Sequence, residues 1–255
     1  MRSSPSALLE RLIAPSSAPA RVAFLTRQPF AHRGLHGALR IENSRAAFRA
    51  AIAAGHGIEL DVQPSFDGIP FVFHDDELDR LTRERGRTDE RTGAQLDAIL
   101  LAGTDETLPR LDAILALIAG RVPVLIEVKH PRSRLSALCL AIRRALEGYG
   151  GEAAVMSFDP RIPRWFAEHA PRIVRGLVAS DRQRRVTVRA RVTRLAALAA
   201  ARPDFLAWDV RDLPSATTVA ARARGMPVLT WTVRDPASER AAFDHADEAI
   251  YERPQ

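Results

Sequence analysis

Residues 44–62, S-R-A-A-F-R-A-A-I-A-A-G-H-G-I-E-L-D-V, contain the signals of one helix followed by one strand. Ser44 is a favourable N-cap, and Ala47, Phe48, Ala51 and Ile52 fall on one face of a helix. The residues after the glycines are an apolar run of the kind that forms a strand. The stretch therefore predicts a helix over 44–54 that leads into a strand over 57–62.

The same alternation extends along the whole chain. Apolar runs bounded by glycine or proline predict strands at 30–33, 57–62, 69–74, 122–129, 153–158, 173–178, 204–209, 227–231 and 248–251. Further helices are expected at 111–118, 135–146, 161–169, 192–201, 216–223 and 237–243. Strand–helix alternation is typical of a parallel sheet, and about eight strands in one domain predict an α/β protein with a TIM-like (β/α)8 barrel.

Three regions depart from a regular barrel. The nine expected strands are one too many, and the step from Asp61 to Ile69 is too short for a helical crossover. We expect an extended return through 63–66, a turn at Asp67 and Gly68, and a second ascent to His74. A polar insertion, 75–107, follows the third strand at the barrel mouth. Residues 1–28 are expected to form a short helix (6–14) and a linker, and residues 29–255 the barrel domain.

Composition excludes several classes of protein. The 255 residues are 46% hydrophobic and 27% charged, which excludes a disordered or fibrous chain, and the single cysteine excludes an intrachain disulfide. The net charge is 37 − 31 = +6, but Lys129 is the only lysine, so the arginine excess indicates a GC-rich genome rather than a nucleic-acid partner. We find neither a membrane span nor a clean signal peptide, and we expect a cytoplasmic protein without stable membrane insertion.

Ionisable residues gather at the carboxyl ends of the early strands, where barrels carry their catalytic groups. Period-2 spacing puts Glu59 and Asp61 on one face of a strand, and Glu127 and Lys129 on one face of another. Three carboxylates from two strands favour one hard divalent cation, Mg²⁺ or Ca²⁺. A metal ion is therefore expected among these strand ends.

The basic residues at the same ends favour a phosphate ligand. The guanidinium of Arg33 and the ammonium of Lys129 suit phosphate oxygens. His32 and His74 titrate near neutral pH and can pass protons. A metal ion, two cations and two histidines together form a set suited to phosphodiester cleavage.

A collinear series of motifs then resembles the glycerophosphodiester phosphodiesterase family. The motifs are H-R-G (32–34), E-N-S (42–44), G-I-E-L-D-V (57–62), D-G-I-P-F-V-F-H-D (67–75), L-D-R-L-T (78–82), L-P-R-L-D (108–112), I-E-V-K (126–129), S-F-D-P (157–160), W-T-V (231–233) and E-A-I-Y-E-R-P (248–254). The resemblance implies a TIM-like barrel that hydrolyses glycerophosphodiesters to glycerol 3-phosphate and an alcohol.

The resemblance also implies a role for each matched residue. It places the catalytic pair at His32 and His74, and a supporting carboxylate at Glu42. It places the metal ligands at Glu59, Asp61 and Glu127, and the phosphate contacts at Arg33 and Lys129. The chain departs from the family pattern at Ile41, where the loss of a proline loosens the turn before the helix. It also departs at Arg83 and Arg234, extra arginines near the barrel mouth that affect substrate selectivity rather than the chemistry.

Several alternatives stay open. A lysophospholipase D or phospholipase-type relative would act on lipids but needs an apolar groove, and a barrel that only binds a phosphate ligand needs no acid and base. The arginine-rich stretch 181–194 is read as a solvated helix face because no aromatic residue interleaves it. Trp231 is either core or a wall for the alcohol group of the substrate. The other histidines are expected to be structural or surface residues: His36, His56, His130, His169 and His245.

The sequence also leaves mechanistic points undecided. It does not decide which histidine is the acid and which the base, nor whether water or a substrate hydroxyl attacks. The head group and the oligomeric state are likewise not predicted.

Overall fold

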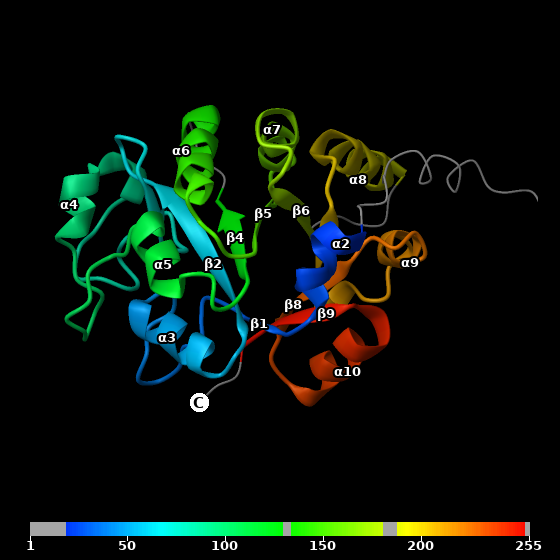
Figure 1. Cartoon of the computed structure of the whole chain (residues 1–255), viewed down its shortest axis with the longest axis horizontal. Coiled ribbons are helices and arrows are strands. Elements are labelled where there is room, and N and C mark those ends of the chain that lie inside the picture. Colours follow the sequence, from blue (N-terminus) through cyan, green and yellow to red (C-terminus); the bar gives the residue numbers. More distant parts are fainter. Residues whose placement is uncertain (1–18, 130–133, 181–187, 253–255) are drawn as a thin grey trace, which may run out of the picture. The chain divides into compact units, whose positions relative to one another are not determined.

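A computed structural model describes residues 19–129, 134–180 and 188–252 (Figure 1). Its eight parallel strands in these ranges, with intervening helices, give the α/β class and the TIM-like (β/α)8 barrel that we predicted. The chain divides into two compact units, a first unit of 30–153 with 252–255 and a second unit of 1–29 with 154–251. The helix expected at 6–14 lies outside the described residues, and the domain boundaries stay a prediction.

The first unit contains the parallel strands β1 (Phe30–Ala31), β2 (Gly57–Pro64) and β4 (Val124–Val128). β2 lies between the other two strands, with Ala31 opposite Ile58 and Asp61 opposite Glu127. Its helices are α3 (Arg45–Ala53), α5 (Leu111–Ile118) and α6 (Leu135–Glu147). The Ser44 hydroxyl accepts a hydrogen bond from the Ala47 amide, as a helix cap requires.

The path after Asp61 differs from our prediction. We expected a return through 63–66 and a second ascent, but β2 continues in its own direction to Pro64 and β3 (Pro70–Val72) runs back antiparallel to it. The length of the segment excludes a helix and does not by itself fix the direction of the return. The hairpin brings the chain back along β2, so that the Phe73 amide donates to the Asp61 carbonyl at 3.0 Å.

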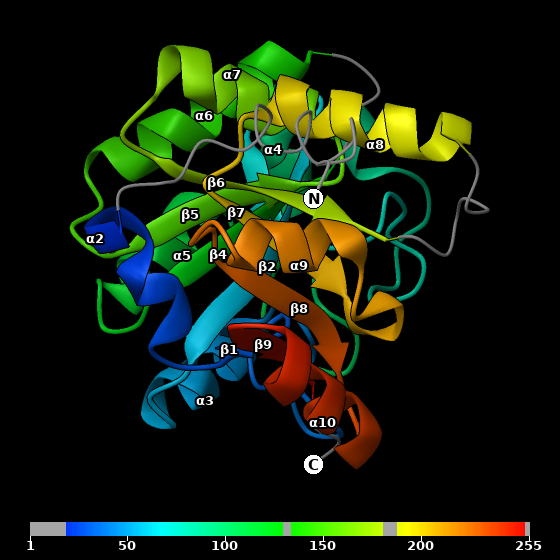
Figure 2. The same cartoon turned by 90° about the vertical axis from the view of Figure 1, so that its right-hand side faces the viewer.

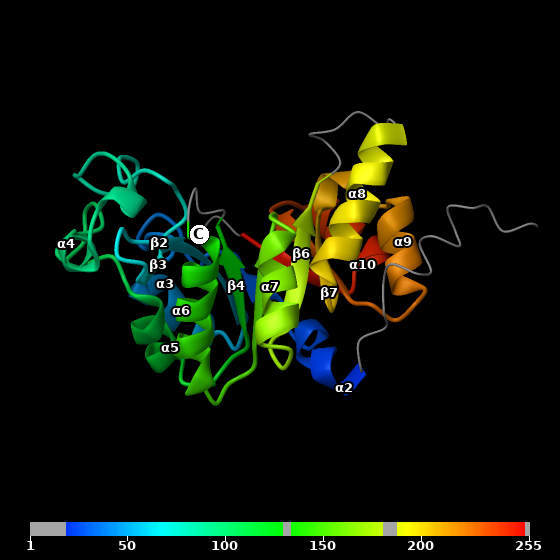
Figure 3. The same cartoon turned by 90° about the horizontal axis from the view of Figure 1, so that it is seen from above.

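The insertion 75–107 is loop-rich, with a 3-10 turn η2 (Thr88–Glu90) and a short helix α4 (Gly93–Asp97). Figures 1 and 3 show α4 beside the carboxyl end of β2, and the Phe66 amide donates to the Arg91 carbonyl at 2.7 Å across this contact. The insertion shares a small apolar core with β3 and the residues that flank it. The buried residues of this core are Phe71, Phe73, Leu78, Leu96, Ile99, Leu101 and Leu108.

The second unit contains α2 (Pro19–Val22), the 3-10 turn η1 (Ala23–Thr26) and five parallel strands in chain order. The strands are β5 (Ala153–Ser157), β6 (Val174–Ala179), β7 (Phe205–Asp209), β8 (Val228–Val233) and β9 (Glu248–Tyr251). The helices that connect them are α7 (Arg161–His169), α8 (Val188–Ala201), η3 (Val210–Asp212), α9 (Ala216–Arg222) and α10 (Pro236–His245). The last two helices pack on β8 and β9 (Figure 2), and α7 lies beside α8 (Figure 3).

None of the helices within the described ranges has both the length and the apolar character that a membrane crossing needs. Of the arginine-rich stretch, 181–187 lies outside the described residues, and α8 begins at Val188.

Candidate active site

Three buried carboxylates meet on β2 and β4. Glu59 and Asp61 are each 1% exposed and Glu127 is 8% exposed. One oxygen of each lies within 4.8 Å of the others. We predicted that these groups stand at strand ends, but β2 continues three residues past Asp61. They still converge, because Asp61 lies opposite Glu127 near the end of β4.

Two cations lie among the three carboxylates. The Lys129 ammonium is 2.6 Å from Asp61 Oδ1 and also contacts Glu127. Arg33 Nε is 3.2 Å from Asp61 Oδ2, and the Arg33 amide donates to Glu59 Oε2 at 3.0 Å. The two cations therefore neutralise part of the negative charge at the point where a phosphate would bring more.

The turn after β1 places Arg33 so that both its amide and its guanidinium reach these carboxylates. Arg33 and Gly34 have φ values of 56° and 79°, in the left-handed region. A Cβ on Gly34 would lie 2.9 Å from atoms of Ala47 and Phe48 in α3. Glycine is therefore required here for the loop to pack against the helix.

Burial and charge divide the carboxylates into two kinds. Burial, and then the negative charges of Asp61 and Glu127, raise the pKa of Glu59 well above its usual value. Burial alone would raise the pKa of Asp61 as well, but Lys129 and Arg33 outweigh it and hold that pKa below its usual value. An additional positive charge nearby would therefore stabilise the ionised form of Glu59.

The arrangement fits a hard divalent cation. Glu59 Oε1 is buried and has no hydrogen-bond partner among the residues that the structure describes. A buried polar atom without a partner is costly, and a bound cation would satisfy it. Three carboxylate oxygens are the ligands that Mg²⁺ and Ca²⁺ prefer. The cluster of Glu59, Asp61 and Glu127 could therefore hold a metal ion.

A chain of ion pairs links Glu42 to His74. Glu42 accepts from Arg33 Nη1 at 2.8 Å and from Arg80 Nη2 at 2.7 Å. Arg80 also bonds Asp75, whose Oδ1 is 2.6 Å from Nδ1 of His74. This series of ion pairs contacts both a phosphate-contact candidate and a histidine, and the supporting role of Glu42 stays a prediction.

Sequence reasoning overlooked Arg80, Asn43 and Gln63. Asn43 Nδ2 donates to Asp61 Oδ2 at 2.9 Å, and Gln63 Nε2 donates to the His74 carbonyl at 3.1 Å. Arg80 and Asn43 lie inside the L-D-R-L-T and E-N-S motifs, and Gln63 directly follows G-I-E-L-D-V. Their place in or beside quoted motifs was the available signal, but the spacing alone does not indicate what they contact.

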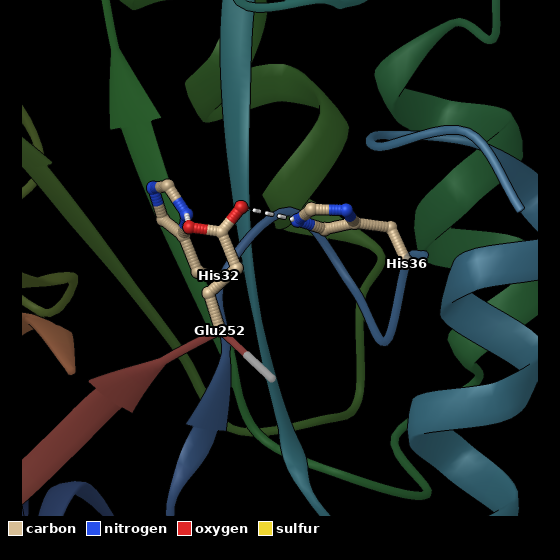
Figure 4. A group of neighbouring side chains, drawn as sticks. All are labelled: His32, His36 and Glu252. Atoms are coloured by element: carbon tan, nitrogen blue, oxygen red, sulfur yellow. Dashed lines mark ion pairs between the residues drawn. The ribbon is translucent and has the colours of Figure 1, made fainter. Parts of the chain in front are cut away.

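The two candidate catalytic histidines have different surroundings. His32 Nε2 is 4.0 Å from Glu59 Oε2, and its Nδ1 is 3.7 Å from Glu252 Oε2 (Figure 4). Burial, and to a lesser extent Arg33, lower the pKa of His32, although Glu252 opposes them. His74 is more exposed, at 32% of its side chain, and is paired with Asp75. Burial thus disfavours the charged form of His32.

Trp231 belongs to the second unit, where it packs against its own neighbours. Its Nε1 donates to the Ala207 carbonyl at 3.0 Å, and its ring meets Phe158 edge to face at 5.4 Å. Trp231 is nevertheless half-buried and Phe158 is 49% exposed, so these contacts do not place the ring in the core. A contact with the alcohol group of a substrate stays a prediction.

A family model and a curated relative both match this chain and point to the same family. The model of the Glycerophosphoryl diester phosphodiesterase family matches residues 32–251. The chain is 30% identical over 172 residues to Glycerophosphodiester phosphodiesterase 1 of Rattus norvegicus, a match that covers 61% of this chain and 51% of that protein. The chain thus spans about half the length of this curated relative.

Solved structures agree on the fold. A phosphodiesterase of Oleispira antarctica, in complex with the product sn-glycerol-3-phosphate, has a TM-score of 0.76 and 22% identity, and the match covers 89% of this chain and 93% of that one. The glycerophosphodiester phosphodiesterase of Thermotoga maritima has a TM-score of 0.70 and 24% identity, with 88% and 94% covered. At these identities the likeness shows the fold alone.

Proposed function

Because the family model matches most of its length, this chain belongs to the glycerophosphoryl diester phosphodiesterase family, and from that premise we propose that it hydrolyses glycerophosphodiesters to glycerol 3-phosphate and an alcohol. The observation that carries the proposal is the buried cluster of Glu59, Asp61 and Glu127 beside two cations and two histidines. The solved relative that binds sn-glycerol-3-phosphate supports the same product here.

The proposed reaction depends on one divalent metal ion, Mg²⁺ or Ca²⁺, held by Glu59, Asp61 and Glu127. When bound, the ion would act as a Lewis acid on a phosphate oxygen. The buried Glu59 Oε1 without a partner supports this assignment. The raised pKa of Glu59 supports it too, because a cation stabilises the ionised form.

Arg33 and Lys129 are the proposed phosphate contacts. Each lies against Asp61, at 3.2 and 2.6 Å, so the carboxylate holds both cations in place. Groups that are fixed before the substrate binds stabilise developing charge without reorganising during the reaction. Glu42 holds the Arg33 guanidinium from its other side.

We assign the proton transfers to His32 and His74. Burial lowers the pKa of His32, so this ring is neutral at pH 7 and able to accept the proton of the nucleophile. Asp75, at 2.6 Å from Nδ1, fixes the orientation of His74, which in its protonated form donates its Nε2 proton to the leaving alkoxide. The nucleophile is either water or the neighbouring glycerol hydroxyl, which would give a cyclic phosphate first.

The experiment measures release of glycerol 3-phosphate from glycerophosphocholine, glycerophosphoethanolamine and glycerophosphoglycerol. Each substrate is assayed with EDTA and after Mg²⁺ or Ca²⁺ is restored. Release that EDTA abolishes and one of the ions restores is the expected result. Release that is insensitive to EDTA would contradict the metal assignment, and choline release from lysophosphatidylcholine alone would favour the lipid alternative.

A further inference from the structure

A second group of metal-binding side chains adjoins the acidic cluster. His32 and His36 follow β1, and Glu252 follows β9 in the chain; Figure 4 shows the carboxylate between the two rings. One ligand atom of each residue lies within 4.8 Å of the others. His36 was expected to be a structural or surface residue, but its side chain is only 16% exposed and faces Glu252.

The spacing in this group suits a tetrahedral metal site. Ligand atoms at about 2.0–2.1 Å from a tetrahedral zinc ion lie roughly 3.3 Å from one another. His36 Nε2 is 3.1 Å from Glu252 Oε1, and His32 Nδ1 is 3.7 Å from Glu252 Oε2, so each nitrogen lies near this separation from a different oxygen of the carboxylate. Both nitrogens are buried and, within the described part of the chain, are ion-paired with Glu252 without forming a well-aligned hydrogen bond.

The chemistry of the group differs from that of the acidic cluster. Two imidazoles with one carboxylate favour transition-metal ions such as Zn²⁺, whereas three carboxylates favour Mg²⁺ or Ca²⁺. The three side chains are 12%, 16% and 22% exposed, so the group lies close to the surface although its two nitrogens are buried. We propose that His32, His36 and Glu252 form a second, transition-metal site, and that its occupancy inhibits the enzyme.

The inhibitory part rests on the proposed function, in which His32 accepts a proton. An imidazole that binds a metal through Nδ1 carries its remaining proton on Nε2. Such a ring has no nitrogen left to accept the proton of the nucleophile. Hydrolysis would therefore stop while Zn²⁺ is bound, even with the acidic cluster occupied by its own ion.

The first test measures zinc binding without reference to activity. The full chain is titrated with Zn²⁺ against a chromophoric chelator, in excess Mg²⁺ so that the acidic cluster is occupied. We expect His36→Gln to weaken Zn²⁺ binding by more than about tenfold, at least the usual effect of disturbing a metal site. His169→Gln is the matched control, because His169 is an exposed histidine stacked on Trp165.

A second substitution and a spectrum guard against misfolding and misassignment. Glu252→Gln should also weaken binding, and Glu127→Gln, which removes a charge of the acidic cluster on β4, should not. The Co²⁺ adduct of the unmodified chain should show the intense visible bands of four-coordinate cobalt, and these bands should be lost in His36→Gln. Wild-type zinc affinity in both His36→Gln and Glu252→Gln would overturn the site.

The last test measures inhibition, with every variant compared to its own zinc-free rate. The Zn²⁺ concentration for half inhibition should rise in His36→Gln by the same factor as the zinc dissociation constant. Zinc that binds at this site without slowing hydrolysis would overturn the inhibitory part. A chain that hydrolyses none of the diesters would overturn the proposed function, whereas the chelator and cobalt measurements would still test the site.

Discussion

The two units of this molecule both bury carboxylates, but they satisfy them differently. In the second unit the buried Asp159, Asp204 and Asp209 each pair with one or two arginines of their own. In the first unit Glu59, Asp61 and Glu127 crowd together and share Arg33 and Lys129. Each buried carboxylate of the second unit thus has its own arginine, whereas the three carboxylates of the first unit share two cations.

Asp209 illustrates the satisfied kind. It is 1% exposed and caps η3 by accepting from the Arg211 amide at 3.0 Å and from Arg211 Nε at 2.8 Å. A buried charge with its own partner stabilises local structure and has no further need of a ligand. Glu59, equally buried, keeps one oxygen without a hydrogen bond among the described residues, and such an atom marks a candidate binding site.

The largest expected effect is loss of a catalytic histidine in the first unit. His32→Ala or His74→Ala should lower kcat by about 10²–10⁴-fold, the usual contribution of proton transfer. The measurement is steady-state release of glycerol 3-phosphate. His245→Ala, in α10 of the second unit, serves as the histidine control. Near-normal turnover in either of the first two variants would remove that histidine from the mechanism.

Glu59→Gln should weaken metal binding and at the same time stabilise the metal-free fold. Its pKa is raised on folding, first by burial and then by Asp61, so the ionised form destabilises the folded protein at pH values above that pKa. Removing the charge should weaken metal binding by about 10- to 100-fold. The same change should raise the free energy of unfolding of the metal-free protein by about 1 kcal/mol. Metal titration and urea unfolding measure the two quantities, and an unchanged metal titration would refute the ligand assignment.

Lys129→Arg is a subtler change in the same unit. Lys129 reaches Asp61 and Glu127 with one small ammonium group, and a planar guanidinium cannot occupy that position in the same way. We expect kcat/KM to fall on the order of tenfold because the phosphate contact is displaced. Full activity of the arginine variant would show that the only lysine of the chain has no special role.

The smallest effect concerns the second unit. Asp209→Ala should cost about 1 kcal/mol of unfolding free energy through the lost cap, with little change in kcat. Burial opposes ionisation of Asp209, but Arg211 outweighs it and lowers its pKa below 3.8. The carboxylate therefore stabilises the fold above pH 3.8, and the difference from Asp209→Ala should shrink as the pH falls through the lowered pKa. Urea unfolding at pH 7 and pH 3 tests both statements, and a large loss of kcat would break the comparison between the units.

Local periodicity was sufficient to predict the strands and the longer helices of the described residues, but not the short helices α2 and α4 or the 3-10 turns. Parallel strands end at a common edge of a sheet, so the convergence of His32, Asp61 and Glu127 could also be predicted. The hairpin direction could not, because the short segment 63–69 allows either direction. Nor could the pairing of Arg80 with Glu42 or of His36 with Glu252, since such long-range contacts leave no periodic signal. What these residues touch depends on the packed fold.

The β2–β3 hairpin also bears on the order in which the site forms during folding. Gln63 and His74 are only 11 residues apart, and the Phe73 amide already bonds the Asp61 carbonyl. Contacts over short loops cost little chain entropy and form early, whereas the contact with Glu127 requires a much larger loop to close. One hairpin thus carries a metal-ligand candidate and a proton-transfer candidate as a single local unit. In pulse-labelled hydrogen exchange, we expect the Phe73 amide to be protected before the amides that join β2 to β4.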